Sequence, residues 1–458
     1  MTLHRMLLAR AEEGRPLRVG LIGAGKFGSM FLAQALHTPG LHVLGVADLS
    51  VATARAALST TGWPKERVGA SSFAKALAQG TTHVTEDAEA LISAGGMEVV
   101  VEATGVPESG IRHALSAIGR GRHVVMVNVE GDVLAGPLLA RRAAEAGVVY
   151  TLAYGDQPAL ICEQVDWARA CGFEVVCAGK GTKYLPAYHA STPDTVWEHY
   201  GLSPGHAKAG ALNPKMFNSF LDGTKSAIEM AAVANATGLT PAPDGLAFPP
   251  AGADELAQVC RPRDDGGALH HKGTVEVVSS VKRNGKPVPR DLRWGVYVTF
   301  EAPSDYVKRC FSEYGLVTDD TGRYTALYRP YHLIGLELGI SVARAGLLGQ
   351  TMGAAQGFVG DVVATAKRRL EAGEMLDGEG GFCVYGTLMP AADSLDCGGL
   401  PIGLAHGVRL KTPIAAGQCL HWSDVDMDEA GDAVRFRRQM EQAFAPRRGR
   451  PERKAETA

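Results

Sequence analysis

The chain has 458 residues, of which 46% are hydrophobic and 21% are charged, and its formal net charge is −3. These values are typical of a soluble globular protein of two or three domains. The chain has no sustained basic stripe, which argues against a nucleic-acid partner. No run of about 18 apolar residues is present, so we expect no membrane contact. The 8 cysteines form no CxxC pair, which argues against a zinc ribbon and favours reduced thiols in a cytoplasmic protein. We predict no metal site.

A glycine-rich turn follows the first predicted strand. Residues 19–22 are apolar, and Gly23-Ala24-Gly25-Lys26-Phe27-Gly28 comes directly after them. Gly23 permits a tight bend, Gly25 lets a pyrophosphate approach the backbone, and Gly28 lets the following helix pack closely on the sheet. The start of that helix presents N–H groups and a positive dipole end to phosphates. The pattern predicts a dinucleotide site that includes Lys26 and Phe27; a purely structural turn is the alternative.

The second predicted strand, residues 43–47, ends in Asp48. An acid about 20 residues after the last glycine of such a turn accepts hydrogen bonds from the adenosine ribose and repels a 2′-phosphate. We therefore expect NAD to be preferred over NADP, although neighbouring basic residues can change that choice.

Short apolar strands then alternate with helices as far as about residue 155. Strands are predicted at 99–102, 123–128 and 147–150, and helices at 108–119 and 138–146. This alternation predicts an α/β domain, residues 1–155, with the doubly wound parallel sheet of the Rossmann type. Ligands bind at the carboxyl ends of such strands, where Ala103, Thr104, Gly105 and Asn128 would line the nicotinamide half of the site. Asn128 could equally well only cap the following turn.

Residues 156–330 predict a less regular α+β domain for substrate binding. Strands are expected at 173–178, 273–281 and 294–300, and one long helix at 216–237. The chain is expected to return to the first domain over residues 331–357, through a buried helix at 333–348.

Lys180 follows the first of these strands, between two glycines. A lysine at a strand end between residues without side chains can bind a carbonyl oxygen or a phosphate, or donate a proton. The alternative is a solvent-exposed lysine in a turn.

Three charged residues are spaced to share one face of the long helix. Asp222, Lys225 and Glu229 follow i, i+3, i+7 spacing among small and apolar residues. Charge on so apolar a helix is costly unless it is paired or faces a cleft. We expect catalytic roles for all three; a structural ion pair is the alternative.

Three more residues are candidates for substrate binding. Arg329 offers a two-pronged donor for carboxylate or phosphate. His332 lies just before the buried returning helix, where it could equally be structural. Asp156 follows the last strand of the first domain, where it could reach the site or cap a helix.

The remaining residues predict a third unit at 358–445, with a tail at 446–458. Strands followed by Ala372-Gly373-Glu374 and, again, by Ala416-Gly417-Gln418 resemble the SAF fold, a small β-rich module. The tail is rich in Arg, Glu and Lys, which is typical of disorder.

Together these motifs resemble a family. The chain is similar to homoserine dehydrogenases in its first half, and as a whole to SAF-bearing oxidoreductases that include the class II, DXR-like 1-deoxy-D-xylulose 5-phosphate reductoisomerases. The matching motifs are Gly23-Ala24-Gly25, Glu102-Ala103-Thr104-Gly105, Asn128-Val129-Glu130, Gly179-Lys180-Gly181, Asp222-Gly223-Thr224-Lys225 and Arg329-Pro330-Tyr331-His332-Leu333. The resemblance implies a homodimeric NAD(P)-dependent oxidoreductase whose Lys180, Lys225 and Arg329 face a small polar, possibly phosphorylated, substrate.

Two features depart from the reductoisomerases. Asp48 is typical of NAD binding, whereas those enzymes use NADPH, and the loop Thr182–His189 is bulkier and more aromatic than expected. We therefore favour simple hydride transfer to or from an aldehyde, ketone or alcohol. In this hypothesis Lys225 protonates the substrate oxygen, Lys180 assists, and Asp222 or Glu229 orients Lys225. The alternatives are the reductoisomerase and a non-enzymatic NAD(H)-sensing or sugar-binding protein, which would not need charge buried on a helix.

Overall fold

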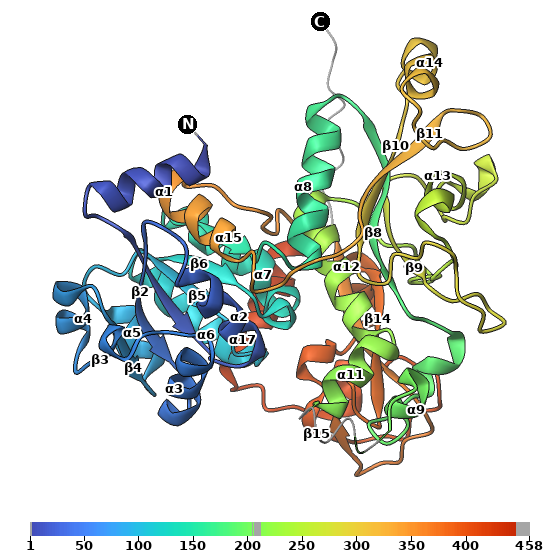
Figure 1. The fold of residues 1–458 in the computed structure, drawn as a ribbon. Helices are drawn as coiled ribbons and strands as arrows, with labels where there is room; N and C mark the ends of the chain where they lie inside the picture. Colours follow the sequence, from blue (N-terminus) through green and yellow to red (C-terminus); the bar gives the residue numbers. More distant parts are fainter. Residues whose placement is uncertain (1, 204, 206–211, 446–458) are drawn as a thin grey trace, which may run out of the picture.

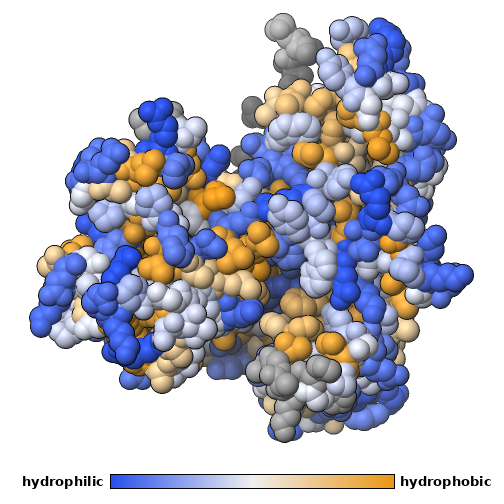
Figure 2. Space-filling model, viewed as in Figure 1, coloured by the Kyte–Doolittle hydropathy of each residue, from blue (hydrophilic) through white to orange (hydrophobic). Residues whose placement is uncertain are grey.

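The computed structural model describes residues 2–203, 205 and 212–445, so the predicted tail at 446–458 lies outside the described residues. The chain forms two lobes (Figure 1). One lobe holds the amino-terminal sheet, and the other holds a second sheet together with most of the carboxyl-terminal β structure. Apolar side chains reach the surface along the junction between the lobes, and hydrophilic ones cover much of the outer rims (Figure 2). No helix in the described ranges is long and apolar enough to cross a membrane.

The first lobe contains the predicted parallel sheet, here with seven strands. They run in the order β3-β4-β2-β1-β5-β6-β7, and each pair of neighbours is parallel. Their bounds are β1 Leu17–Ile22, β2 Leu41–Ala47, β3 Val68–Ala70, β4 Thr82–Thr85, β5 Val99–Glu102, β6 His123–Met126 and β7 Tyr150–Leu152. The doubly wound fold is therefore confirmed.

Helices cover both faces of this sheet, which is why its central strands are apolar throughout. The helices are α1 Leu3–Glu12, α2 Lys26–Ala35, α3 Val51–Thr60, α4 Phe73–Gln79, α5 Ala88–Ser93, α6 Pro107–Gly119 and α7 Val129–Glu145. One hydrophobic cluster joins the sheet to α2 and α3, and another joins it to α5, α6 and α7. The first cluster also takes in Leu338 and Val342, because the chain returns through α15 Gly339–Ala343 and packs on α2.

The second lobe is built on a mixed four-stranded sheet, as the α+β prediction requires. Its order is β11-β10-β8-β9, with bounds β8 Glu174–Thr182, β9 Thr274–Ser279, β10 Val296–Glu301 and β11 Tyr324–Arg329. The helices of this part are α8 Gln157–Ala170, α9 Val196–Tyr200, α11 Pro214–Leu221, α12 Thr224–Thr237, α13 Leu256–Val259 and α14 Asp305–Glu313. Helices α8 and α12 pack against each other and against this sheet.

Strand β8 is longer than predicted, and this changes the position of Lys180. The residue lies within the strand, paired with Val296 on β10 and with Val277 on β9, rather than in a turn beyond the strand end. Glycine at position 179 lets the strand continue, because a β-carbon there would collide with the carbonyl oxygen of Glu276. The side chain of Lys180 is consequently buried, with 6% of the residue exposed.

The predicted helix at 216–237 is two helices, α11 and α12. Gly223 separates them at φ +91°, a left-handed conformation that favours glycine. Asp222 therefore ends the first helix instead of sharing a face with Lys225 and Glu229, and the predicted common face of all three residues is wrong.

The carboxyl-terminal part has the expected β structure. Strands β12 Gly360–Ala366 and β14 Val384–Pro390 form an antiparallel pair, and β13 Met375–Asp377, β15 His406–Leu410 and β16 Val425–Asp426 form a three-stranded sheet. Gly373 and Gly417 have φ of +87° and +79° in matching turns, closed by N–H groups of Glu374 and Gln418. Two helices were not predicted: α16 Ala391–Cys397, and α17 Asp432–Phe444, which packs on α6 and α7 of the first lobe.

Candidate active site

The glycine-rich turn has the geometry that a dinucleotide needs. Gly23 has φ +94°, and a β-carbon there would lie 2.6 Å from the carbonyl oxygen of Ala103. A β-carbon on Gly28 would meet the carbonyl oxygen of Gly23, so only glycine lets α2 start this close to β1. Gly25 faces open space, and Lys26 beside it is exposed. The turn is therefore rigid where it packs and open where a pyrophosphate would lie.

Asp48 lies beside this turn, at the carboxyl end of β2. Its Oδ2 accepts a hydrogen bond from the N–H of Ala24 at 2.9 Å, and its Oδ1 accepts one from the N–H of Ser50 at 3.0 Å. These two bonds fix the carboxylate at the edge of the open turn. Leu49 is 94% exposed next to it and offers an apolar surface at the same edge.

The ends of β5 and β6 border the same edge of the sheet. Thr104 donates its hydroxyl to the buried carboxylate of Glu102 at 2.6 Å, and Gly105 has φ +68° in the turn that follows. Asn128 caps α7: its Oδ1 accepts from the N–H of Gly131 at 3.0 Å, and its Nδ2 donates to the carbonyl of Val106 at 2.9 Å. Of its two predicted roles, the structure shows the helix cap.

A cluster of charged side chains lies at the starts of three helices. Glu130 stands in the first turn of α7, Asp156 and Gln157 at the start of α8, and Lys225 and Glu229 in the first two turns of α12. Helix α12 packs against both α7 and α8, so these starts meet between the two lobes (Figure 1). Their positive dipole ends favour an anionic group there.

Lys180 reaches this cluster from β8. Its Nζ donates to Oε1 of Gln157 at 2.9 Å and forms an ion pair with Oε2 of Glu229. The side chains of Lys180 and Glu229 are 7% and 5% exposed. The ammonium of Lys180 is therefore buried between a carboxylate and an amide oxygen, which give it one defined direction.

Lys225 is paired with Glu130, and both side chains remain partly open, at 16% and 15% exposure. Burial alone would lower the pKa of the amine. The four carboxylates of Glu130, Glu229, Glu379 and Asp156 outweigh burial and raise the pKa of Lys225 above its ordinary value. Lys225 is therefore charged at neutral pH, with its ammonium at the boundary of the cluster.

Asp156 caps α8, because its Oδ1 accepts from the N–H of Gln157 at 2.9 Å. It also belongs to the cluster. Burial, reinforced by repulsion from Glu229, raises the pKa of Asp156 to about 6, although the charges of Lys225 and His332 oppose the shift. Both alternatives raised by the sequence thus apply to this residue: it caps a helix and it lies at the site.

Three other predicted residues stand apart from the two lysines. The carboxylate of Asp222 pairs with Nζ of Lys367 at 2.8 Å, so its predicted role of orienting Lys225 is wrong. Arg329 pairs with Glu337 at 2.6 Å and covers the ring of Tyr331. His332 bonds to the carbonyl of Trp294 through Nδ1 at 2.8 Å, and only its charge acts on Asp156.

Glu130 belongs to the predicted Asn128-Val129-Glu130 motif, but its pairing with Lys225 was not predicted, and three further partners were missed: Gln157, Lys367 and Glu379. Gln157 directly adjoins Asp156, and its position in the first turn of α8 is the signal that could have found it. Lys367 and Glu379 come from the carboxyl-terminal part of the chain, more than 100 residues away from the lysines in sequence.

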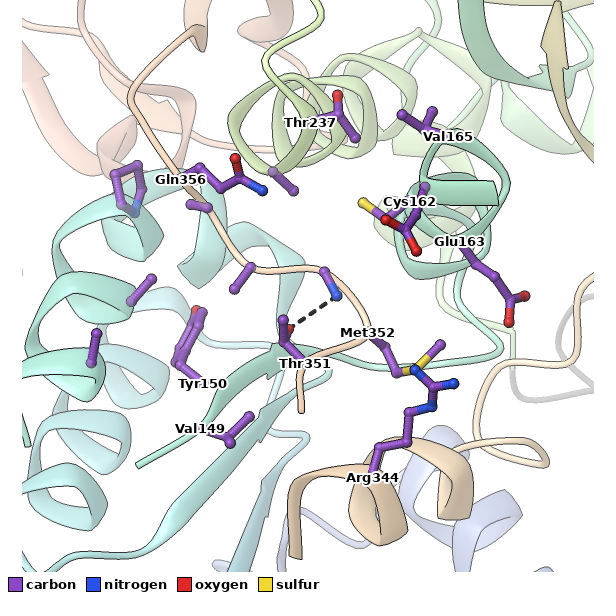
Figure 3. A pocket seen from close by; sticks show the side chains of 18 of the residues that line it. Val149, Tyr150, Cys162, Glu163, Val165, Thr237, Arg344, Thr351, Met352 and Gln356 are labelled. Atoms are coloured by element: carbon purple, nitrogen blue, oxygen red, sulfur yellow. Dashed lines mark hydrogen bonds between the residues drawn. The ribbon is translucent and has the colours of Figure 1, made fainter. Parts of the chain in front are cut away.

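A hollow of about 900 Å³ lies elsewhere in the described structure and is not this site. It is lined by the second halves of α7 and α8, the end of α12 and the start of β7. Cys162, Glu163, Arg344 and Met352 face it (Figure 3). In doubly wound sheets ligands bind at the carboxyl ends of strands, which is the opposite edge. Within the described ranges, no group of three His, Cys, Asp or Glu side chains could hold a metal ion.

Two family models match parts of the chain. Residues 155–338 match the family model described as "Oxidoreductase DRL, catalytic domain", and residues 361–426 match the SAF domain. Lys180 and Lys225 lie in the first of these regions. The chain therefore carries an oxidoreductase catalytic domain followed by a SAF domain, on an amino-terminal domain of the fold that binds dinucleotides.

Solved structures show similarity over a smaller part of the chain. A biliverdin reductase from Synechocystis sp. PCC 6803, in complex with biliverdin and NADP+, is 18% identical over 37% of this chain and 48% of its own, with a TM-score of 0.26. A myo-inositol dehydrogenase from Corynebacterium glutamicum ATCC 13032 is 13% identical over 40% and 48%, with a TM-score of 0.27. The chain thus spans about half the length of these proteins, and TM-scores this low carry no functional conclusion for it. No curated protein matched the sequence.

Proposed function

We propose that this enzyme uses a nicotinamide cofactor, NAD in preference to NADP, and transfers a hydride to or from a small polar aldehyde, ketone or alcohol. One observation carries the proposal. Lys225 pairs with Glu130 at the start of α7, which follows β6, and Lys180 bonds to Gln157 at the start of α8, which follows β7. Both ammonium groups therefore meet the carboxyl-end side of the first sheet, where the open turn at Gly23–Gly28 also lies. A cofactor held by the turn would extend past Thr104 toward the two lysines.

The residues of the chain would provide binding and charge, while the bound nicotinamide supplies or accepts the hydride. In the direction of reduction, the Lys225 ammonium would polarise the carbonyl oxygen and donate a proton to it. Lys180, paired with Glu229, would bind a second oxygen of the substrate. Two fixed ammonium groups and three helix starts favour a substrate rich in oxygen, including a phosphorylated one.

A second candidate is the 1-deoxy-D-xylulose 5-phosphate reductoisomerase reaction, in which rearrangement precedes reduction. The pair of lysines favours it, because a phosphorylated hydroxyketone presents several oxygens to bind. Asp48 opposes it, since a carboxylate fixed beside the turn would repel the 2′-phosphate of NADPH. A screen of aldehydes, ketones, alcohols and this phosphorylated sugar, which follows the absorbance of reduced nicotinamide, distinguishes the two candidates.

A third reading, a sensor of NAD(H) without catalysis, accounts poorly for the cluster. Two buried or half-buried lysine–carboxylate pairs stabilise a fold little, because desolvation offsets their attraction. The homoserine dehydrogenase-like and homodimeric properties that the resemblance implies remain part of this proposal. Sedimentation of the purified protein tests the second of them.

Replacing Asp48 with alanine should weaken NADH binding by roughly 10- to 100-fold, because hydrogen bonds to a charged acceptor contribute about 1.5–3 kcal/mol. NADPH binding should change little or improve. Asp48→Asn is the matched control. It keeps an oxygen that accepts from the N–H of Ala24 but removes the negative charge, so it should bind NADPH more tightly than the unmodified protein does and keep the conformation of the turn. Calorimetric titrations in which the unmodified protein binds NADPH more tightly than NADH would contradict the assignment.

Lys180→Met should raise the KM for the substrate by roughly 10-fold or more and leave the Kd for NADH unchanged, because the variant loses a charge-assisted contact to the substrate and none to the cofactor. Lys183→Met is the control, since Lys183 bonds to the backbone carbonyl of His199 outside the cluster. Equal KM values for the two variants would show that Lys180 is only the structural partner of Glu229.

A further inference from the structure

The hollow of about 900 Å³ lies between the two lobes, away from the lysine cluster. Helices α7, α8 and α12 begin at that cluster, and their later turns line the hollow. Residues 349–356, which connect the returning helix to β12, cross it as a further wall (Figure 3). A volume of this size is within the roughly 300–1,000 Å³ typical of small-molecule sites. No group of the mechanism proposed above lines the hollow, so the reaction does not account for it.

The segment that crosses the hollow is fixed to both lobes. The N–H of Met352 donates to the hydroxyl of Thr151, on β7 of the first lobe, at 2.8 Å. The N–H of Gln356 donates to the carbonyl of Asn235, on α12 of the second lobe, at 2.8 Å. Between these bonds Gly353 has φ +130°, and a β-carbon on it would lie 3.0 Å from a side chain of α8. The hollow is therefore preformed, with walls that do not depend on a ligand.

Three arginines line the hollow from three elements: Arg141 on α7, Arg169 near the end of α8, and Arg344 directly after α15. Arg141 lies over the ring of Phe444, 4.1 Å from its centre. Arg169 donates to the carbonyl of Thr237, at the end of α12, at 2.7 Å. In the part of the chain that the structure describes, none of the three pairs with a carboxylate, and the guanidinium of Arg344 has no hydrogen-bond partner. Arg344 is therefore free to take a ligand.

The acids of the hollow are confined to one wall. Glu163 and Asp166 both lie on α8, and Glu163 already accepts the hydroxyl of Tyr154 at 2.5 Å. Among the described residues, the walls formed by α7 and by the crossing segment contribute no acid. The positive charges of Arg141 and Arg344 are consequently unopposed on those two sides, which favours an anionic group there.

Much of the remaining lining is apolar. Val149, Val165 and Met352 face the hollow, and the side chain of Arg344 extends toward Met352 (Figure 3). Trp167, on α8, lines it as well and is 40% exposed. A guanidinium without a partner, next to apolar surface, suits a carboxylate that is attached to an apolar body.

We propose that this hollow is a separate small-molecule site, which binds an amphipathic acid with one carboxylate on an aliphatic or aromatic body. The carboxylate binds to Arg344, Arg141 adds a second positive charge, and the apolar body packs against Met352 and Val165. The site does not depend on the function proposed above, because it shares no residue with the dinucleotide turn or with the lysine cluster.

Titration calorimetry with decanoate tests the proposal. The unmodified protein should bind a single decanoate, and Arg344→Met should raise its Kd by roughly 10-fold or more, because the charge-assisted contact to the carboxylate is lost. Arg142→Met is the matched control, since Arg142 is exposed on α7 but does not line the hollow. It should change the Kd by less than about 2-fold. Equal Kd values for the two variants, or no saturable binding by the unmodified protein, would overturn the proposal.

A second pair of variants locates the ligand. Ala144 is exposed near the end of α7 and lines the hollow, so Ala144→Trp fills part of it and should abolish decanoate binding. Ala146→Trp, also exposed but outside the lining, should leave the Kd unchanged, and melting temperatures show that both variants fold. If Ala144→Trp does not fold, the comparison of Arg344→Met with Arg142→Met decides.

Competition with NADH separates this site from the dinucleotide turn. Saturating NADH should not displace decanoate, because a dinucleotide binds at the carboxyl ends of the strands, which is the opposite edge of the sheet. Displacement by NADH, or undiminished decanoate binding by a folded Ala144→Trp, would place decanoate outside the hollow and contradict the proposal.

Discussion

Replacing Lys225 with methionine should lower turnover by a factor of 10²–10⁴, the range typical of a positioned acid or base, with little change in the Kd for NADH. The reason is the location of Lys225. Four carboxylates raise the pKa of its ammonium, and its side chain is still 16% exposed at the edge of the cluster. Methionine fills a similar volume but offers no proton. The measurement is kcat and KM with a substrate from the screen, alongside an NADH titration.

The same variant should become sensitive to pH. Without the cation, Glu130, Glu229 and Asp156 remain close to one another, and their pKa values should rise in the folded state. A carboxyl group whose pKa is raised in the folded state lowers the stability of the fold as pH rises toward that pKa. The melting temperature of Lys225→Met relative to the unmodified protein should therefore fall between pH 6 and pH 8. Lys225→Arg, which restores the charge, should remove that fall. Full turnover in Lys225→Met would show that the lysine is only an ion-pair partner.

The second large effect concerns stability. Arg437→Met should lower the free energy of unfolding by roughly 3–5 kcal/mol, because it leaves Asp361 buried without its cation. The guanidinium of Arg437 is fully buried and donates to both carboxylate oxygens of Asp361, at 3.1 and 2.6 Å, and to Glu441 at 2.9 Å. It joins α17 to β12 and, through the carbonyl of Leu134, to α7. Urea unfolding measures the change.

Two comparisons isolate this ion pair. Arg435→Met, in the same helix, removes an exposed pair with Asp432 and should change the free energy of unfolding by less than about 1 kcal/mol. The double variant Asp361→Leu with Arg437→Met should regain most of the loss, because neither charge is then buried alone. A loss for Arg437→Met no larger than that for Arg435→Met would mean that α17 does not depend on this contact.

The first domain could be predicted from the sequence because its signals are local. A strand, a turn with glycines at fixed positions and an acid after the next strand are read along a single stretch, and Gly23, Gly28 and Asp48 occupy the expected positions. The matching turns at Gly373 and Gly417 were predictable for the same reason, since each needs a positive φ at one residue.

The lysine cluster could be predicted only in part, because its partners are distant in sequence. Helical spacing linked Lys225 to Asp222, but the turn at Gly223 ends that relation and places Asp222 beside Lys367 instead. The acid that Lys225 contacts, Glu130, is 95 residues away in sequence. Such pairs follow from how α7, α8 and α12 pack, and periodicity within one segment contains no information about that.

The most direct test of the account is a crystal structure of the protein with bound NAD(H). We expect one dinucleotide, with its pyrophosphate on the turn at Gly23–Gly28, a ribose hydroxyl on Asp48, and the nicotinamide C4 about 6–7 Å from Nζ of Lys225. That separation leaves room for the carbonyl group of the substrate. Its carbon would lie roughly 3–3.5 Å from the nicotinamide C4, and its oxygen would lie roughly 3–3.5 Å from Nζ of Lys225. A nicotinamide ring bound far from Lys225, or a dinucleotide bound elsewhere on the protein, would contradict the assignment of this cluster as the active site.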